Sequence, residues 1–213
     1  MKKIINKRLE NISAFIKNSE KVIDIGCDHA LLGIYLVLNR QNIKVISSDI
    51  NPGPLKKAQE NLIRYHVENK IELRLGNGLE AMDEDIETVI ISGMGGISMI
   101  NILKNIKRYP KIGKIILSPN NDFPFVRLEM SKLGYKIDKE IMILENNKFY
   151  PIMVIIKGHQ EINYYFGKLD LNDELIKKYY KNIYNKNKKI LQNIDNLDLK
   201  KENELIMNNI LIE

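Results

Sequence analysis

The sequence has a single cysteine and no long apolar run. Cys27 stands alone among 213 residues, so a disulfide framework is excluded and a reducing compartment fits. No stretch approaches the roughly 18 apolar residues of a membrane-spanning helix. The basic segment at residues 1–8 has no apolar stretch behind it, which argues against a signal peptide. We therefore expect a cytoplasmic protein that does not bind a membrane.

The chain carries an excess of positive charge. Its formal net charge is +6 and its pI is about 9.1. A basic surface attracts polyanions such as nucleic acid. The sequence is also rich in Lys, Ile and Asn, a composition that genome-wide bias can produce. Charge alone therefore leaves a nucleic-acid partner and compositional bias as equal alternatives.

Short β-branched runs alternate with helical patterns over the first 160 residues. Four of the runs are almost continuously apolar, as in a parallel sheet covered on both faces. The last two runs have no helix between them and should pair antiparallel. This order predicts a Rossmann-like α/β fold with a seven-stranded, mostly parallel sheet that ends in an antiparallel hairpin, the layout of class I methyltransferases. The expected strands are 22–25, 44–48, 71–74, 88–92, 114–118, 135–144 and 150–157, and the expected helices are 30–39, 54–65, 97–105 and 125–133.

The pattern changes after residue 162. Apolar residues spaced alternately by four and three run from Ile176 to Leu197, interrupted by Asn187, which predicts a coiled-coil seam. A second helix over 203–211 should complete an antiparallel helical hairpin. We therefore divide the chain into a Rossmann-like domain at residues 1–162 and a C-terminal helical extension at residues 163–213.

In an open α/β sheet, ligands bind at the carboxyl ends of the strands. The first such loop contains Asp24, Gly26, Cys27, Asp28 and His29. Gly26 permits a tight turn. The dinucleotide fingerprint would require glycine at the position of Asp28, whose carboxylate would repel a pyrophosphate. A ligand with an ammonium or sulfonium group would be attracted, which favours S-adenosylmethionine over NAD. A tight turn with solvated acids is the alternative.

Three further loops offer binding groups. Asp49, followed by Ile50 and Asn51, can accept hydrogen bonds from ribose hydroxyls, or can cap the next helix. Asn77 has both a donor and an acceptor for an adenine edge, with glycines on both sides including Gly78; a plain turn is equally open. The glycine-rich segment Gly93-Met94-Gly95-Gly96 can form the floor of a site, and Met94 can pack on a flat ring. It lacks the Gly-Lys-Ser/Thr continuation of a phosphate-binding loop.

The fifth strand is followed by Ser118-Pro119-Asn120. Amino-methylating enzymes often carry an Asn-Pro-Pro-Tyr-like motif at this place. A side-chain amide next to a proline can form a hydrogen bond with an exocyclic amine or a ring nitrogen. A turn with proline at its second position is the simpler alternative.

Together these segments resemble the bacterial tRNA (adenine-22-N1)-methyltransferases. The resemblance covers essentially the whole chain, including the helical tail, although this tail is short. Three positions depart from the family pattern, which usually has Asp at Asn77, Gln at Ser118 and often Pro at Gly33. The segments that carry the resemblance are 7–9, 24–30, 76–80, 93–96 and 118–120.

The resemblance implies methyl transfer from S-adenosylmethionine to N1 of an adenine in tRNA, with S-adenosylhomocysteine as product. It assigns Asp28 and Asn120 to catalysis, with Asp28 as an electrostatic stabiliser or a base, and Lys7, Arg8, Ser118 and Pro119 to the substrate. A buried structural role for His29 stays open. We expect a monomer without metal. The expected cofactor-binding residues are Asp24, Gly26, Cys27, His29, Asp49, Ile50, Asn51, Asn77, Gly78, Gly93, Met94 and Gly95.

The basic stretch at residues 177–189 holds six lysines and three tyrosines without an acid. It can grip an RNA backbone, or it can be a solvated helix face beside seam residues. Two other functions remain open: a methyltransferase that acts on a different substrate, and a non-catalytic RNA-binding module with a vestigial cofactor site.

Overall fold

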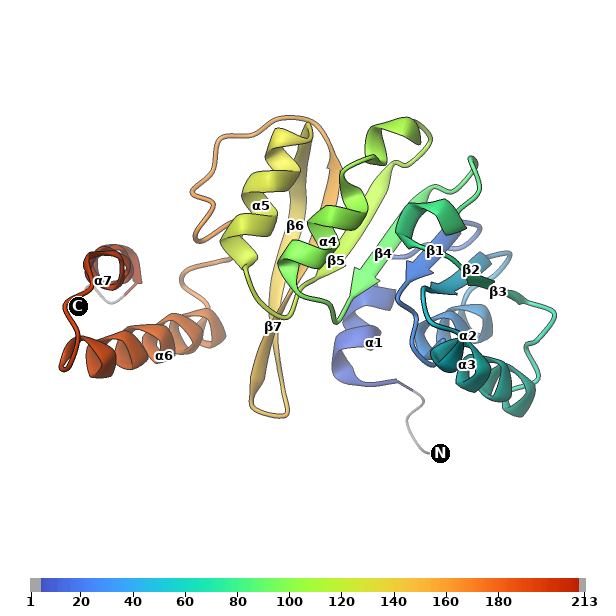
Figure 1. Cartoon of the computed structure of the whole chain (residues 1–213), viewed down its shortest axis with the longest axis horizontal. Coiled ribbons are helices and arrows are strands. Elements are labelled where there is room, and N and C mark those ends of the chain that lie inside the picture. Colours follow the sequence, from blue (N-terminus) through green and yellow to red (C-terminus); the bar gives the residue numbers. More distant parts are fainter. Residues whose placement is uncertain (1–4, 211–213) are drawn as a thin grey trace.

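A computed structural model describes residues 5–210, and its centre is a seven-stranded sheet with the order β3-β2-β1-β4-β5-β7-β6 (Figure 1). β1 to β5 are parallel; β7 runs antiparallel to β5, and β6 antiparallel to β7. The predicted Rossmann-like sheet with a terminal hairpin is therefore confirmed. The strands are β1 (Lys21–Ile25), β2 (Lys44–Asp49), β3 (Ile71–Leu75), β4 (Thr88–Ser92), β5 (Lys114–Ser118), β6 (Tyr135–Glu145) and β7 (Lys148–Lys157).

Helices cover both faces of the sheet. One core packs α1, α2 and α3 on one face, and the other packs α4 and α5 on the opposite face, where Figure 1 shows them in front of the strands. Neighbouring strand residues such as Val22 and Ile23 enter different cores because side chains alternate along a strand. The helices are α1 (Lys7–Ser13), α2 (Leu31–Asn39), α3 (Pro52–Arg64), α4 (Gly96–Leu103), α5 (Phe123–Lys132), α6 (Glu174–Leu191) and α7 (Leu197–Ile210), with short 3₁₀ turns η1 (Gly78–Ala81) and η2 (Ile106–Arg108).

The hairpin between β6 and β7 turns at Asn146 and Asn147. Both residues have positive φ angles, 49° and 59°, as a two-residue turn of this kind requires. Asn tolerates this conformation better than most residues. β7 pairs with β5 only through Met153–Ile155, whereas its pairing with β6 continues to Lys148. The tip of the hairpin therefore extends beyond the end of β5.

Two sequence-based boundaries differ from the structure near the N-terminus. α1 was not expected, because its seven residues are too few for a clear periodicity. The side chain of Asn6 accepts a hydrogen bond from Leu9 N at 2.9 Å and caps this helix. α3 begins at Pro52 rather than Pro54, and proline is well tolerated in the first turn.

The predicted coiled-coil seam is wrong at its C-terminal end. α6 ends at Leu191, and the next seam residues, Ile194 and Leu197, are 59% and 64% exposed. α7 starts at Leu197, earlier than expected. In Figure 1 α6 lies across the view while α7 is seen end-on, so the helices cross and do not run side by side. The 3–4 spacing continued by chance through a connection rich in Asn and Asp, residues that favour turns over helix interiors.

Asn187, the buried asparagine in the predicted seam, has a hydrogen-bond partner on α7. Asn187 donates from Nδ2 to Glu202 of α7 at 2.6 Å, and the other Glu202 oxygen accepts from the hydroxyl of Tyr165 at 2.7 Å. Ile176 and Tyr180 of α6 belong to the same hydrophobic core as the sheet. The division of the chain at residue 162 stays a prediction.

A buried ion pair fastens the segment before α6 to the sheet. Glu140 of β6 accepts from Arg127 Nε at 3.0 Å and Nη2 at 2.9 Å, and both side chains are almost fully buried. Arg127 Nη1 also donates to the carbonyls of Tyr164 at 2.9 Å and Tyr165 at 2.6 Å. The second Glu140 oxygen accepts from Lys168 N at 2.8 Å. Arg127 and Glu140 thus hold the linker that carries the C-terminal helices.

No helix within residues 5–210 has the length and apolar character needed to cross a membrane.

Replacing Arg127 with Met should lower the free energy of unfolding by about 3–5 kcal/mol, because Glu140 then stays buried without a partner. The double variant Arg127→Met/Glu140→Leu should recover much of this loss. Urea denaturation followed by circular dichroism measures both. The control Lys132→Ala removes an exposed ion pair with Glu129 and should change stability by less than about 1 kcal/mol. A double variant no more stable than the single one would contradict this account.

Candidate active site

A cavity of about 780 Å³ lies at the carboxyl ends of the parallel strands. Its walls come from the loops after β1, β2, β3 and β4, together with parts of α1 and α4. This is the edge at which open α/β sheets bind ligands. Of the residues predicted from sequence, the cavity is lined by Arg8, Asp24, Gly26, Cys27, Asp28, His29, Asp49, Ile50, Asn51, Asn77, Gly78, Gly93 and Met94.

Backbone hydrogen bonds tie these loops to the ends of neighbouring strands. Gly26 N and Cys27 N both donate to Ser48 O, at 2.8 and 2.9 Å. Gly76 N donates to Asp49 O at 3.0 Å, and Gly93 N donates to Ser118 O at 3.0 Å. The loops therefore continue the hydrogen bonding of the sheet, which fixes their positions relative to one another.

Two glycines allow the loops after β1 and β4 to approach closely. Gly26 has a φ of +74°, and a Cβ at this position would collide with the terminal methyl of Met94. Gly93 has a φ of +81°, and a Cβ there would lie 3.2 Å from Arg8 Nη2. Both conformations are unfavourable for other residues. The glycines are therefore needed for the backbone shape of the cavity.

Asp24 is the buried carboxylate of the site. It is 4% exposed, and its pKa is raised to about 7, first by burial and second by the charge of Asp49. Within residues 5–210 its carboxylate has no hydrogen-bond partner. A buried carboxylate of this kind is stabilised by a cation or a hydrogen-bond donor. The site is therefore suited to a ligand that presents positive charge, such as the ammonium group of an amino acid.

Asp28 and His29 form the outer part of the same loop. The Asp28 side chain is 71% exposed, and Asp28 and Ala30 both have left-handed backbone, with φ of 51° and 55°. His29 Nδ1 lies 3.5 Å from an Asp28 carboxylate oxygen, and this buried nitrogen makes no hydrogen bond to any described residue. The turn thus presents one free carboxylate at the cavity and one buried donor or acceptor without a partner.

Cys27 is buried beside Asp24 in this loop. Burial raises the pKa of its thiol well above the usual range, and the charges of Asp24 and Asp49 raise it further. A thiol that stays protonated is a poor nucleophile. Cys27 therefore contributes to the cavity as a buried wall residue and not as a nucleophile.

The loops after β2 and β3 form the other end of the cavity. Asp49 accepts a hydrogen bond from Asn51 N at 2.9 Å, so it stabilises the turn into α3 and also lines the cavity. Ile50 is an apolar residue that is 61% exposed, and Asn77 is exposed. Gly78 has a φ of +57°, and a Cβ there would contact Ile102 at 2.9 Å. The cavity thus offers apolar surface beside an amide, as a flat heterocycle requires.

Arg8 closes the cavity on the side of β5. Its guanidinium lies 4.6 Å from the centre of the Tyr150 ring, and Nη1 donates to Asn120 Oδ1 at 3.2 Å. Asn120 Nδ2 in turn donates to Gly93 O at 2.5 Å, and Asn120 N donates to Met94 O at 2.8 Å. α1, the loop after β4 and the loop after β5 are therefore connected at one point.

Five predicted residues lie outside the lining of this cavity. Ser118 and Pro119 are buried, and Ser118 Oγ has no hydrogen-bond partner among the described residues; their role toward a substrate stays a prediction. A Cβ on Gly95 would lie 3.1 Å from Asn121 Oδ1. Lys7 is exposed on α1, and Asn120 lines a neighbouring cavity.

The sequence reasoning missed the contributions of two helices. Asn6 and Leu9 reach the cavity from α1, and Ser98, Asn101 and Ile102 reach it from α4. The rule that ligands bind at strand ends directs attention to loops and not to the helix faces behind them. The spacing of Ser98, Asn101 and Ile102 after a glycine-rich loop was the available signal, since residues three and four apart share a helix face.

Comparison with known proteins places the chain among methyltransferases. The family described as "Methyltransferase domain" matches residues 5–153. The tRNA (adenine(22)-N(1))-methyltransferase of Bacillus subtilis is 30% identical over 162 residues, which cover 75% of this chain and 68% of the relative.

Solved structures with bound cofactor or product are also similar. A Streptococcus pneumoniae protein in complex with S-adenosyl-L-methionine has a TM-score of 0.90 at 28% identity, covering 97% of this chain and 99% of the other. TrmK of M. capricolum, in complex with S-adenosyl-homocysteine, has a TM-score of 0.85 at 31% identity, covering 98% and 97%.

The raised pKa of Asp24 predicts a pH-dependent stability. The pKa of Asp24 is about 7 in the folded protein, against an ordinary value of 3.8 that applies to the unfolded chain. Between these two pH values the folded state binds more protons than the unfolded state. The free energy of unfolding should therefore fall as the pH rises from about 4 to 7. Asp24→Asn should not show this fall, so its stability relative to the wild type should increase as the pH rises to about 7. Urea denaturation at pH 5, 6, 7 and 8 tests this, with Asp28→Asn as the control for removing an exposed carboxylate from the same loop. A constant difference between Asp24→Asn and wild type would contradict the assignment.

Proposed function

The chain belongs to the family of the tRNA (adenine(22)-N(1))-methyltransferases, and from this premise we propose that it transfers a methyl group from S-adenosylmethionine to N1 of adenine 22 in tRNA. The observation that carries the proposal is the cavity itself. It combines a buried carboxylate that has no cationic partner among residues 5–210, an apolar surface beside an amide, and an exposed carboxylate.

The cavity residues divide according to the parts of the cofactor. Asp24 faces the positively charged amino acid end, supported by the loop of Gly26, Cys27 and His29. Asp49 has the carboxylate that ribose hydroxyls require, with Asn51 holding its orientation. When bound, S-adenosylmethionine supplies an electrophilic methyl group on a positively charged sulfur.

The adenine ring of the cofactor fits the end formed by Ile50, Asn77 and Gly78. Ile50 offers apolar surface, and the Asn77 amide can pair with an adenine edge. Met94, which lies against Gly26, forms the floor near the methyl group together with Gly93, and Gly95 allows Asn121 to approach this loop closely. Ser118 and Pro119 support the loop from beneath.

On the acceptor side the protein has to position a base and stabilise charge. Adenine N1 carries a lone pair, so no strong base is needed before methyl transfer. Alignment of the reacting atoms can contribute about 7–11 kcal/mol. The methylated ring becomes cationic, and the exposed carboxylate of Asp28 stabilises that charge. Asn120, held between Arg8 and Gly93, positions the base.

The basic groups at and around the cavity suit the tRNA backbone. Lys7 and Arg8 lie beside the site, and the lysines of α6 extend along one exposed helix. Phosphate contacts of this kind position an RNA and bind it in a salt-dependent way. Adenine N1 in a paired nucleotide is accessible only after unpairing or flipping. We propose that the protein acts in the cytoplasm as a monomer.

Incubation of the purified protein with labelled S-adenosylmethionine and bulk tRNA lacking the modification should label the RNA, and digestion should release 1-methyladenosine. Changing A22 to G in a transcribed tRNA should abolish labelling. Cofactor binding without label in any tRNA would refute the proposed reaction. Label in a protein or a small molecule instead would favour a methyltransferase with another substrate, and RNA binding without cofactor binding would favour the non-catalytic module.

Asp28→Ala should reduce kcat by about 10²- to 10³-fold, because it removes a charge that acts on the transition state. The dissociation constant for S-adenosylmethionine, measured by calorimetry, should change less than threefold. Asp28→Asn keeps the shape and should lose most of the activity as well. An Asp28→Ala enzyme with nearly wild-type kcat would refute the role of this carboxylate.

A further inference from the structure

A second cavity, of about 640 Å³, lies next to the active site beyond the end of β5. It lies where the hairpin extends past the last pairing with β5, so that β7 from Lys148 to Ile152 is paired with β6 but has no strand on its β5 side. The start of α5 and Tyr179 of α6 form its other walls. The cavity therefore joins the sheet domain to the C-terminal helices.

The lining of this second cavity is aromatic. Phe123, Phe149, Tyr150 and Tyr179 come from α5, β7 and α6. The rings of Phe149 and Tyr179 are 5.2 Å apart and tilted by 56°, and those of Phe123 and Tyr179 are 6.1 Å apart. All but Phe123 are only partly buried. Aromatic faces open to solvent are the surfaces on which unstacked nucleobases stack.

The two cavities share a wall. Asn120 lines the second cavity and accepts a hydrogen bond from Arg8, which lines the first. Tyr150 lines the second cavity and carries the Arg8 guanidinium on its ring. A nucleotide in the second cavity is therefore directly next to the place where Asn120 meets the acceptor base.

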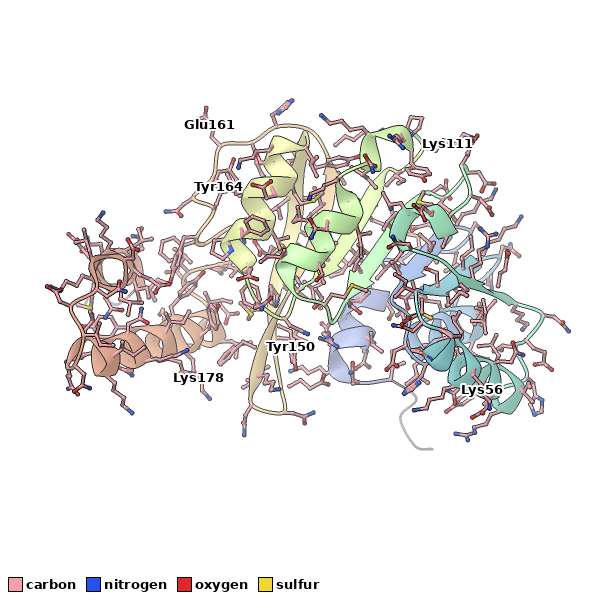
Figure 2. All side chains as sticks on the ribbon, in the orientation of Figure 1. Lys56, Lys111, Tyr150, Glu161, Tyr164 and Lys178 are labelled. Atoms are coloured by element: carbon pink, nitrogen blue, oxygen red, sulfur yellow. The ribbon has the colours of Figure 1, made fainter. Side chains whose placement is uncertain are left out.

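The charge around the second cavity fits an RNA strand. Lys148 lines it, with Asp122 as the one lining carboxylate. Lys178 is exposed and adjacent to Tyr179 on α6, and helical spacing places Lys186 on the same side as Tyr179. Figure 2 shows Tyr150 and Lys178 along the same lower side of the molecule, near the hairpin. Lysines around an aromatic cavity favour a ligand with both phosphates and flat rings.

We propose that the second cavity binds an unstacked nucleobase of the tRNA next to the acceptor adenine, stacked against Tyr179 and Phe149. The proposal rests on the proposed function, because it takes the cofactor to occupy the first cavity and the acceptor base to lie between Asp28 and Asn120. Opening the strand around the acceptor exposes the neighbouring base, and stacking on Tyr179 compensates for the stacking lost in the RNA. Tyr179 thus acts as a positioning residue for the substrate.

The first test is kinetic. Tyr179→Ala should raise KM for tRNA by about 5- to 150-fold, the loss of one stacked base, while kcat and the affinity for S-adenosylmethionine change less than threefold. Tyr179→Phe should restore the wild-type KM. The control Tyr180→Phe removes a buried hydrogen bond to Tyr165 on the same helix and should lower the thermal midpoint without changing KM. A Tyr179→Ala enzyme with KM within twofold of wild type would overturn the proposal.

The second test needs no catalysis. The chain has no tryptophan, so Tyr179→Trp provides a single tryptophan whose emission can be excited selectively over that of the tyrosines. Saturating tRNA should quench its emission, whereas a reporter at Tyr164→Trp, which Figure 2 shows at the opposite end of the sheet from Tyr150, should change little. Binding of tRNA without quenching at position 179 would overturn the proposal.

These outcomes separate the two proposals. Quenching by tRNA without methylation would refute the reaction but support the cavity as a base-binding site. Methylation without quenching, or with an unchanged KM in Tyr179→Ala, would refute the cavity and leave the reaction intact. An emission change that depends on protein concentration in the absence of RNA would identify a second copy of the chain as the occupant and overturn the proposal.

Discussion

The active site depends on backbone hydrogen bonds at one edge of the sheet. The loops after β1, β3 and β4 each donate to the last residues of a neighbouring strand, at Ser48, Asp49 and Ser118. The sheet register therefore sets the spacing of the loops, and glycines allow the close approach. Asp24, at the centre of this edge, is buried because the strands on both sides enclose it. The same bonds that extend the sheet thus create a carboxylate that lacks a cation.

The fold was largely predictable because its strands are short, apolar and separated by clear breaks. The hairpin could be predicted because only Asn146 and Asn147 lie at its turn. The C-terminal seam was predicted correctly as far as Ile190. Periodicity gives the spacing of apolar residues but not the residue at which a helix ends, and Ile194 fits the spacing although α6 ends at Leu191. α1 was too short to give a signal, although its cap, Asn6, is a common capping residue.

The site could be located but not completed from sequence. The strand-end rule identified the loops, and the cavity does contain most of the residues named on that basis. It could not show that Ser118 is fully buried, since the side of a strand that a last residue faces depends on the sheet register. It also missed Ser98 and Asn101, which reach the cavity from α4. Tertiary packing, rather than local pattern, decides these positions.

Arg8 lines the first cavity and contacts two residues that line the second, Asn120 and Tyr150. A side chain shared in this way makes the two ligands thermodynamically linked. If either ligand moves the guanidinium, it changes the affinity for the other, and the coupling free energy is necessarily the same in both directions. The enzyme therefore has a physical basis for heterotropic cooperativity between cofactor and RNA within a single short helix, without any movement of domains.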